Sequence, residues 1–234
     1  MPLHRLLRLS PTAALGLWHR TESAAALWPL LPGAGAAYAA LLPPTAGPPR
    51  QAQWLAGRAL AHAVAAELWP GAPSLLVRNA GATGRPFLAG PDVPAGAVVS
   101  LSHSGEWAAA LLATGGRAGV DVEAVRDKAR RIASKFLSAN ELAATRAVPA
   151  AAADAHFVLL WSAKETLYKL AARRGLTFKE QLLLEPFSPA PAGEIAAVLH
   201  LADGSSRHRI CYSQPAAGYV LTYCWEPDAP AALL

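Results

Sequence analysis

Hydrophobic and polar positions divide the chain into helical and extended segments. The pattern of residues 1–49 is hard to assign, although the proline-rich stretch 43–49 predicts a loop. Residues 50–69, RQAQWLAGRALAHAVAAELW, are dense in alanine and leucine and free of proline, which predicts a helix. Shorter elements follow: a strand at 74–80, a loop at 81–96, two short strands in 97–114 separated by the polar turn SHSGE, and a strand at 118–124.

The second half of the chain repeats this order loosely. Residues 128–137 predict a helix, and the capping box from Ser138 to Glu141 predicts the start of another. Residues 152–174 predict a long helix that ends at Gly175. Three strands follow, around 195–201, 206–213 and 218–225, and an Asp203-Gly204 turn joins the first two.

This order indicates an α+β fold made of two similar halves. The predicted helices WLAGRALAHA, from Trp54, and WSAKETLYKL, from Trp161, both begin with tryptophan and carry a polar side chain four positions on. Such a match is expected of related halves, but alanine-rich helices also resemble one another through composition alone. On the first interpretation, an N-terminal half of residues 1–115 is followed by a C-terminal half of residues 116–234.

The composition favours a folded protein with a sizeable core. Of 234 residues, 53% are hydrophobic and 16% are charged, whereas disordered chains show the reverse balance. No uninterrupted apolar stretch approaches the roughly 20 residues of a membrane-spanning helix. The opening MPLHRLLRLS also lacks the apolar segment and cleavage site of a signal peptide. These features predict a soluble cytoplasmic protein with no membrane partner.

The two cysteines fit the same interpretation. Cys211 and Cys224 both lie in predicted strands near the C-terminus, where small buried core residues are expected rather than a disulfide bridge. Their spacing does not match a cysteine-based metal site.

The net charge of +5 indicates anionic partners. Most arginines are dispersed along the chain, and no signature of a nucleic-acid-binding module is present, so nucleic acid is not the expected partner. The basic run from Arg126 to Lys135 is the exception. It is either the solvated face of a helix or a surface that seats an acidic partner.

Two carboxylates stand one residue apart at the end of an apolar run, in the segment GVDVE. In a strand, residues i and i+2 project from the same face, so Asp121 and Glu123 lie side by side while Val120 and Val122 point into the core. Two such anions repel each other unless a cation lies between them. Carboxylate, water and phosphate oxygens are the ligands of magnesium, so the pattern indicates a magnesium site. Taken alone, this spacing is equally typical of the solvent face of a strand.

A second charged group lies in the long predicted helix. At about 100° per residue, Trp161, Lys164, Glu165, Tyr168 and Lys169 fall on one stripe. If that stripe packs against the end of the GVDVE strand, Glu165 supplies a third carboxylate and the two lysines supply positive charge for a phosphate. Taken alone, the stripe is typical of i,i+4 pairing on a helix, which is worth a few tenths of a kcal/mol.

Together, the two motifs resemble the paired signature of the 4′-phosphopantetheinyl transferases. GVDVE is similar to the segment (V/I)-G-(V/I)-D, and WSAKETLYK is similar to (F/W)-(S/C/T)-x-K-E-x-x-x-K. The larger subclass, which activates surfactin and enterobactin synthetases, is also similar at RQAQWLAGR, GRP, LSHSGEW and FLSANE. The resemblance touches residues 50–185 and none of the first 49.

The resemblance implies an enzyme that transfers the 4′-phosphopantetheine arm of coenzyme A to a serine hydroxyl of an apo acyl or peptidyl carrier protein, releasing 3′,5′-ADP. It implies a pseudo-dimer of two α+β halves in one monomer, with the active site in the cleft between them. Mg²⁺ is the implied cofactor, held by Asp121, Glu123 and Glu165. Carrier proteins are acidic, which is why the basic run is a candidate docking surface.

The same resemblance assigns the other site residues. Glu165, directly or through a water, would accept the proton of the attacking serine, and Lys169 would counter the charge on the phosphoryl oxygens. Lys164 would contact the α-phosphate or pair with a neighbour on its helix. His103 would lie with Ser102 near the 3′-phosphate, although a turn histidine that caps a strand end is the alternative. The further anion or adenine contacts would be Arg50, Arg58 and Arg85.

A non-catalytic module that binds coenzyme A or a carrier protein is the alternative function. It would keep the fold and lose the chemistry. The presence of every metal ligand and phosphate lysine of the signature argues against it.

Overall fold

The structure is a computed structural model, and each of its two compact units is an antiparallel sheet covered by helices. One unit holds residues 1–118 with 225–234, and the other holds residues 119–224. The sequence places the boundary between Gly115 and Gly116. The structure describes residues 3–31, 33, 35–71, 75–81 and 83–228.

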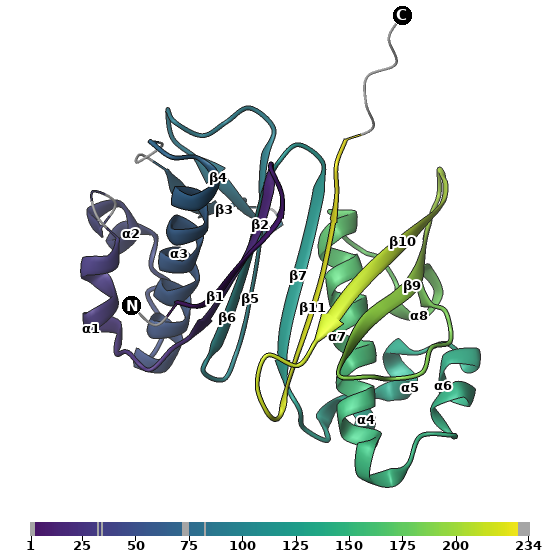
Figure 1. The fold of residues 1–234 in the computed structure, drawn as a ribbon. Coiled ribbons are helices and arrows are strands. Elements are labelled where there is room, and N and C mark those ends of the chain that lie inside the picture. The colour runs from purple at the N-terminus through teal and green to yellow at the C-terminus, as the bar shows by residue number, and fades with distance from the viewer. Residues whose placement is uncertain (1–2, 32, 34, 72–74, 82, 229–234) are drawn as a thin grey trace, which may run out of the picture. The chain divides into compact units, whose positions relative to one another are not determined.

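The sheet of the first unit has the strand order β1-β2-β6-β5, and every neighbouring pair is antiparallel (Figure 1). The side chains of the two central strands, β2 and β6, are buried along almost the whole length of each strand. Such strands read as continuous apolar runs instead of alternating patterns. The four strands are β1 (Leu3–Ser10), β2 (Ala13–His19), β5 (Ala97–Ser104) and β6 (Trp107–Thr114).

Helix α3 (Pro48–Leu68) packs on this sheet, as the sequence predicts for residues 50–69. Two prolines open the helix, where their missing N–H groups would have no partner in any case. The approach to β2 is close at Gly16, since a Cβ there would lie 2.5 Å from Cγ2 of Val64. The remaining helices of the unit are α1 (Ala24–Leu27), the 3-10 turn η1 (Trp28–Leu30) and α2 (Gly35–Leu41).

Two predictions for the first unit are wrong in part. The segment 81–96, expected to be a loop, contains β4 (Pro86–Ala89), which pairs antiparallel with β3 (Leu76–Asn79). The glycines and prolines of this segment predict a loop, although four of its residues form a strand. The expected turn SHSGE is mostly strand, because β5 continues to Ser104 and the chain turns only at Gly105, with φ 57°, and its neighbour Glu106. Residue 74 of the expected strand lies outside the described residues.

The sheet of the second unit has the strand order β7-β11-β10-β9-β8 (Figure 1). The strand predicted at 118–124 and the three predicted near the C-terminus are confirmed. The turn between β9 and β10 lies at Ala202 and Asp203, one residue before the predicted position. The three-residue β8 was not predicted. The strands are β7 (Arg117–Ala124), β8 (Leu182–Leu184), β9 (Ala192–Leu201), β10 (Gly204–Ser213) and β11 (Tyr219–Glu226).

Helix α7 (Ala153–Ala171) packs on this second sheet and carries the WSAKETLYK motif. It ends before Gly175, because Ala172 already has left-handed backbone at φ 56°. The helix predicted at 128–137 is wrong as one element, since it breaks at Ile132. The predicted capping box is confirmed, with Ser138 and Glu141 both bonded. The shorter helices are α4 (Lys128–Arg131), α5 (Ala133–Phe136), α6 (Ala139–Thr145), η2 (Ala150–Ala152) and α8 (Phe178–Gln181).

Cys211 and Cys224 lie in β10 and β11 as predicted, and neither forms a disulfide in the described part of the chain. Cys224 is buried, while Cys211 is half-buried. Within the described ranges, no helix combines the length and the apolar character that crossing a bilayer requires.

Candidate functional site

The GVDVE segment lies in β7 and is more deeply buried than a solvent-facing strand. Val120 and Val122 are fully buried, as predicted, and Asp121 retains only 3% of its exposure. Glu123 is half-buried. A carboxylate this deep is costly unless a cation or hydrogen-bond donors compensate it, so the solvent-face alternative does not describe Asp121.

Gly119 explains how β7 comes so near α7. A Cβ at this position would overlap the carbonyl oxygen of Thr166 and lie 3.1 Å from the amide nitrogen of Leu170. Only glycine therefore permits this separation of strand and helix. The glycine of the motif sets the distance from which the charged side chains of α7 reach the strand.

Lys169 of α7 reaches β7 directly. Its Nζ donates to Oδ1 of Asp121 at 2.8 Å and to the carbonyl oxygen of Val120 at 2.8 Å. The Lys169 side chain is 25% exposed, whereas that of Asp121 is 4% exposed. An ammonium has three donors, so one remains for a further acceptor.

Glu165 lies one turn before Lys169 and shares the field of the same charges. Burial and the negative charge of Asp121 raise the pKa of Glu165, Lys169 lowers it and Glu123 raises it, and the net result is a pKa of about 7. The three carboxylates predicted as metal ligands are therefore electrostatically coupled. In the portion of the chain that the structure describes, however, no three His, Cys, Asp or Glu side chains already gather as a metal site. The metal site stays a prediction.

Three hydroxyl groups fix α7 on the sheet, and the sequence reasoning did not single them out. Thr222 of β11 lies between Ser162 and Thr166, with oxygen–oxygen distances of 2.9 Å and 2.7 Å. The Thr222 hydroxyl also lies 2.9 Å from the Ser162 carbonyl oxygen, to which it can donate. All three residues are fully buried. Ser162 and Thr166, the two hydroxyl residues that flank Lys164 and Glu165 in WSAKET, are the sequence signal for this contact. They fall on the face of α7 that meets the sheet.

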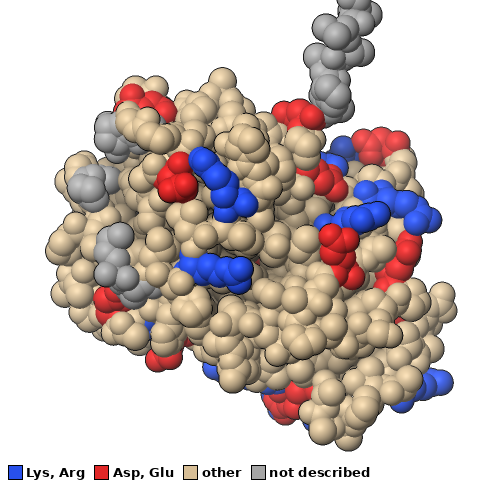
Figure 2. Space-filling model, viewed as in Figure 1, with Lys and Arg blue, Asp and Glu red and all other residues tan. Residues whose placement is uncertain are grey.

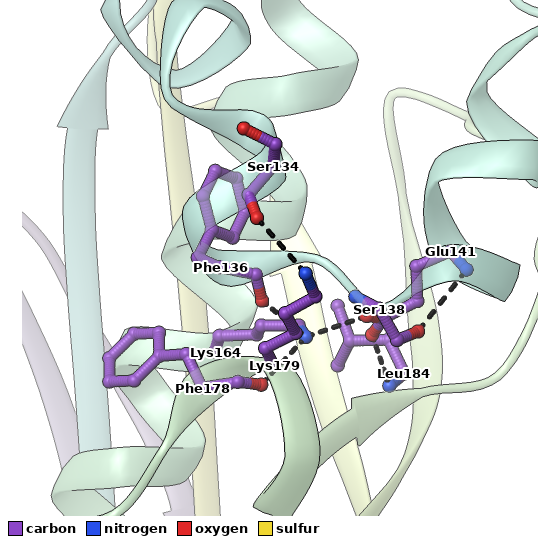
Figure 3. A network of polar contacts seen from close by, with 8 residues as sticks. All are labelled: Ser134, Phe136, Ser138, Glu141, Lys164, Phe178, Lys179 and Leu184. Atoms are coloured by element: carbon purple, nitrogen blue, oxygen red, sulfur yellow. Dashed lines mark hydrogen bonds and ion pairs between the residues drawn. The ribbon is translucent and has the colours of Figure 1, made fainter.

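Lys164 does not lie where the sequence places it. Its ammonium is fully buried and donates to Oε2 of Glu141 at 2.7 Å and to the carbonyl oxygens of Phe136 at 2.9 Å and Phe178 at 3.0 Å (Figure 3). All three donors are used inside the second unit. This geometry contradicts an α-phosphate contact, and the partner is not a neighbour on its own helix.

Glu141 completes this network, which the sequence did not predict. Its Oε2 also accepts the amide of Ser138, and its Oε1 accepts the amide of Leu184 at 2.8 Å (Figure 3). The capping residue of α6 thus joins α6, β8 and α7. Burial lowers the pKa of Lys164, and the hydrogen bond and charge of Glu141 oppose that shift. The ion pair of Lys164 and Glu141 is therefore a buried structural contact that connects α7 to α6.

The aromatic residues of the stripe form a separate cluster. The Trp161 ring lies 5.1 Å from Phe136, edge to face, and 5.6 Å from Phe178, while Tyr168 lies 5.5 Å from Phe178. The predicted stripe therefore has two functions in the structure. Its aromatic members and Lys164 pack inside the second unit. Lys169 bonds to Asp121 of β7, and Glu165 is electrostatically coupled to that residue.

The five residues predicted to contact the nucleotide belong to the first unit. Arg58 is buried in α3, with its guanidinium 3.8 Å above the Trp54 ring and 2.6 Å from Oδ1 of Asn79. Burial lowers its pKa to about 10. No carboxylate pairs with Arg58 among the residues described, and its buried Nε has no hydrogen-bond partner. The structure thus holds a cation that lacks a counter-ion.

The other four residues of that group are more accessible. Arg50 is exposed in the first turn of α3, and Arg85 is half-buried in the β3–β4 loop, where burial lowers its pKa. Ser102 and His103 lie next to each other in β5, opposite Ala109 and Ala108 of β6. His103 is exposed and belongs to the strand itself, so the alternative of a turn histidine is wrong.

The charged side chains of the basic run are exposed, whereas Ala129 and Ala133 between them are buried. Two of its arginines are paired, Arg130 with Asp154 at 2.7 Å and Arg131 with Asp127 at 3.4 Å. The face of the molecule in Figure 2 is mostly uncharged, and its blue and red side chains lie in small mixed groups instead of one broad basic surface.

Comparison with known families matches both parts of the chain. Residues 117–224 match the 4′-phosphopantetheinyl transferase superfamily, and residues 37–113 match the 4′-phosphopantetheinyl transferase N-terminal domain. The first match contains β7 and α7, and the second contains α3 and β5. With its two α+β units and its strand–helix carboxylates, the chain belongs to the 4′-phosphopantetheinyl transferase superfamily.

Individual relatives agree with this family. The chain is 35% identical over 123 residues to 4′-phosphopantetheinyl transferase AcpT of Escherichia coli (strain K12), a match of 52% of this chain and 58% of that protein. It is 32% identical over 104 residues to 4′-phosphopantetheinyl transferase psf-1 of Bacillus pumilus, covering 44% of this chain and 42% of the relative. The chain therefore spans about half the length of the curated relatives it matches.

Proposed function

We propose that this protein transfers the 4′-phosphopantetheine arm of coenzyme A to a serine hydroxyl of an apo acyl or peptidyl carrier protein. The observation that carries the proposal is the contact between β7 and α7, where Lys169 bonds to Asp121 and the coupled Glu165 has a pKa of about 7. Those residues belong to the two motifs of a superfamily whose members AcpT and psf-1 are named for this transfer.

In the proposed reaction, the serine oxygen bonds to the phosphorus that carries the pantetheine arm. The bond from that phosphorus to the bridging oxygen of the diphosphate breaks, and 3′,5′-ADP leaves with the bonding electrons. The serine proton passes to Glu165, directly or through a water, because a positioned carboxylate can act as the general base. Lys169, with one donor left, offsets the negative charge on the phosphoryl oxygens.

The acidic side chains fit a magnesium ion in their chemistry. Asp121, Glu123 and Glu165 offer carboxylate oxygens, which magnesium prefers as ligands. After burial, repulsion from Asp121 and Glu123 raises the pKa of Glu165, and a divalent cation would relieve that repulsion. When bound, the ion would neutralise charge on the diphosphate and polarise its oxygens. The residues that would hold it are these three carboxylates.

The proposal also covers the residues that would contact the nucleotide of coenzyme A. Arg58 has no counter-ion among the described residues and Arg85 is partly desolvated, so an anion at either guanidinium would be favourable. We extend the proposal to Ser102 and His103 for the 3′-phosphate and to Arg50 as an outer contact. Lys164 is not part of it, because the buried Glu141 pair uses its ammonium.

Intact mass spectrometry of a carrier protein tests the function. Purified enzyme, coenzyme A, Mg²⁺ and an apo carrier are expected to raise the carrier mass by about 340 Da, the phosphopantetheine unit gained on phosphoryl transfer. Several carrier types, from fatty-acid, polyketide and peptide assembly, are tried in parallel. Glu165→Gln and Asp121→Ala should abolish the gain while the variants keep a cooperative unfolding transition.

The alternative, a non-catalytic module, gives a different result. Such a protein would bind coenzyme A or a carrier in a titration but leave every carrier mass unchanged with Mg²⁺ present. That combination of retained binding and absent transfer would replace the enzyme proposal with the binding proposal.

A further inference from the structure

The second unit contains a hollow on the side of α7 that does not carry Glu165. It has a volume of about 610 Å³, within the range typical of small-molecule sites. Its walls come from α6, the chain between α6 and α7, the first turns of α7, and the segment that follows β8 (Figure 1). Its main apolar contacts are Ala144, Val148, Leu160, Phe187 and Pro189.

A smaller hollow adjoins the first. It has a volume of about 240 Å³ and shares Val148, Ala152, His156 and Pro189 with its neighbour. His156 thus lines both spaces. An elongated ligand could occupy the two together, with the imidazole at their junction.

The lining offers no charge to an anion. Among the residues described around both hollows there is no lysine or arginine. The two carboxylates of the wall are already engaged, Glu141 with Lys164 and Glu185 with Arg207 at 2.9 Å. The diphosphate of coenzyme A would find no partner there, and neither would a free cation. The charges on the wall therefore select an uncharged ligand.

Among the described residues that line the two hollows, His156 has a buried side-chain nitrogen whose hydrogen bonding is incomplete. It is 7% exposed, and its Nδ1 is buried without a hydrogen-bond partner. Burial lowers the pKa of His156, so the ring is neutral at physiological pH and has one N–H donor and one acceptor nitrogen. The ring lies 5.7 Å from Phe187, tilted by 35°, and Phe187 lies 5.9 Å from Tyr212. A buried polar atom without a partner is costly, so its retention at a cavity wall calls for an explanation.

We propose that this hollow is a binding site for an uncharged, mainly apolar small molecule that hydrogen-bonds to the imidazole of His156 and packs on Phe187. The size of the cavity, the pairing of both carboxylates in its described lining and the incomplete hydrogen bonding of His156 each favour that ligand class. The site does not include Asp121, Glu123, Glu165 or Lys169, and its existence does not depend on the proposed transfer.

The test uses the full chain and N-phenyl-1-naphthylamine, an uncharged apolar probe whose fluorescence rises on leaving water. The folded protein should bind it saturably at one site. Ala144→Trp and Ala152→Trp place a large ring at exposed positions of the lining, so each should reduce affinity at least tenfold. Ala143→Trp and Ala151→Trp are matched controls, since each lies beside a lining residue, is exposed, and does not line either hollow.

The imidazole is tested by competition. In the wild type, 2-naphthol should displace the probe about threefold to tenfold better than 2-methylnaphthalene, since only naphthol has a hydroxyl for the ring, and one hydrogen bond is worth that ratio. His156→Leu should remove this preference while still binding the probe. Absence of saturable binding, or equal affinity in the lining variants and their controls, would overturn the site. A naphthol preference unchanged in His156→Leu would overturn the function given to the imidazole.

Discussion

The two lysines of the WSAKETLYK motif have different environments, although the helical pattern places them on one stripe. Lys164 is fully buried and bonded to Glu141, while Lys169 is partly exposed and bonded to Asp121. The sequence predicts their shared stripe and the proximity of Lys169 to the carboxylates. It could not predict the burial of Lys164, because its partner lies in another helix and its other acceptors are backbone carbonyls of Phe136 and Phe178.

Lys164→Met tests this difference. Removing one partner of a buried ion pair leaves the other charge uncompensated and lowers the free energy of unfolding by about 3–5 kcal/mol. Urea denaturation should show that loss, and the double variant Lys164→Met with Glu141→Gln should recover part of it. If Lys164→Met keeps its stability and loses only affinity for coenzyme A, Lys164 contacts the phosphate, and the structural function given to it here is wrong.

Glu165 makes stability depend on pH in the absence of divalent ions. Its pKa is raised from 4.5 in the unfolded chain to about 7 in the folded protein. Between these values the folded state binds more protons, so the free energy of unfolding falls as pH rises through this window. The stabilisation of Glu165→Gln relative to wild type should therefore be small at pH 5 and reach about 1–2 kcal/mol at pH 8, allowing for solvent screening.

Thermal unfolding of the two proteins in EDTA measures that difference. Asp121→Asn removes the nearby charge and should reduce the pH dependence of wild type. A gap between wild type and Glu165→Gln that is the same at pH 5 and pH 8 would show that Glu165 titrates as an ordinary carboxyl group.

At the level of elements, the site depends on how closely α7 packs on β7 and β11. Gly119 permits the approach, and the hydroxyl groups of Ser162, Thr166 and Thr222 fix the helix on the sheet. The sequence predicts β7, α7 and the capping box well, because their periodicity and caps are local signals. It misses the short strands β4 and β8, since three or four residues carry too little pattern, and their pairing with the neighbouring strands β3 and β9 decides them.

Gly119→Ala tests the close approach. The added methyl group would overlap the backbone of α7 at Thr166, so the helix must shift away from β7. We expect a loss of about 1–3 kcal/mol of stability, as for other overpacked cores, and a loss of transfer larger than the loss of folded protein.

Gly57→Ala is the matched control for that variant. Gly57 lies inside α3, and the nearest atom to an added Cβ is Cδ1 of Leu101 at 4.0 Å. Alanine is favoured over glycine in a helix by up to about 1 kcal/mol, so this variant should be at least as stable as wild type. Equal behaviour of the two variants would contradict the special packing of Gly119.

At the scale of the whole molecule, the chain combines two α+β units with separate hydrophobic cores. The superfamily signature lies in the second unit, and the N-terminal domain match lies in the first. The sequence predicts the family through a few motif residues, because their chemistry constrains them more than packing does. It leaves residues 1–49 unassigned, although they contain β1 and β2, because β2 pairs with β6 about a hundred residues further on and β1 pairs in turn with β2.

The central claim is that Asp121, Glu123 and Glu165 act together on one divalent ion and the diphosphate of coenzyme A. Isothermal titration of Mg²⁺ into the protein saturated with coenzyme A tests it most directly. We expect one ion per chain in the wild type, and affinity reduced at least tenfold in Asp121→Asn, Glu123→Gln and Glu165→Gln, each still folded. Unchanged Mg²⁺ affinity in all three folded variants would contradict the claim.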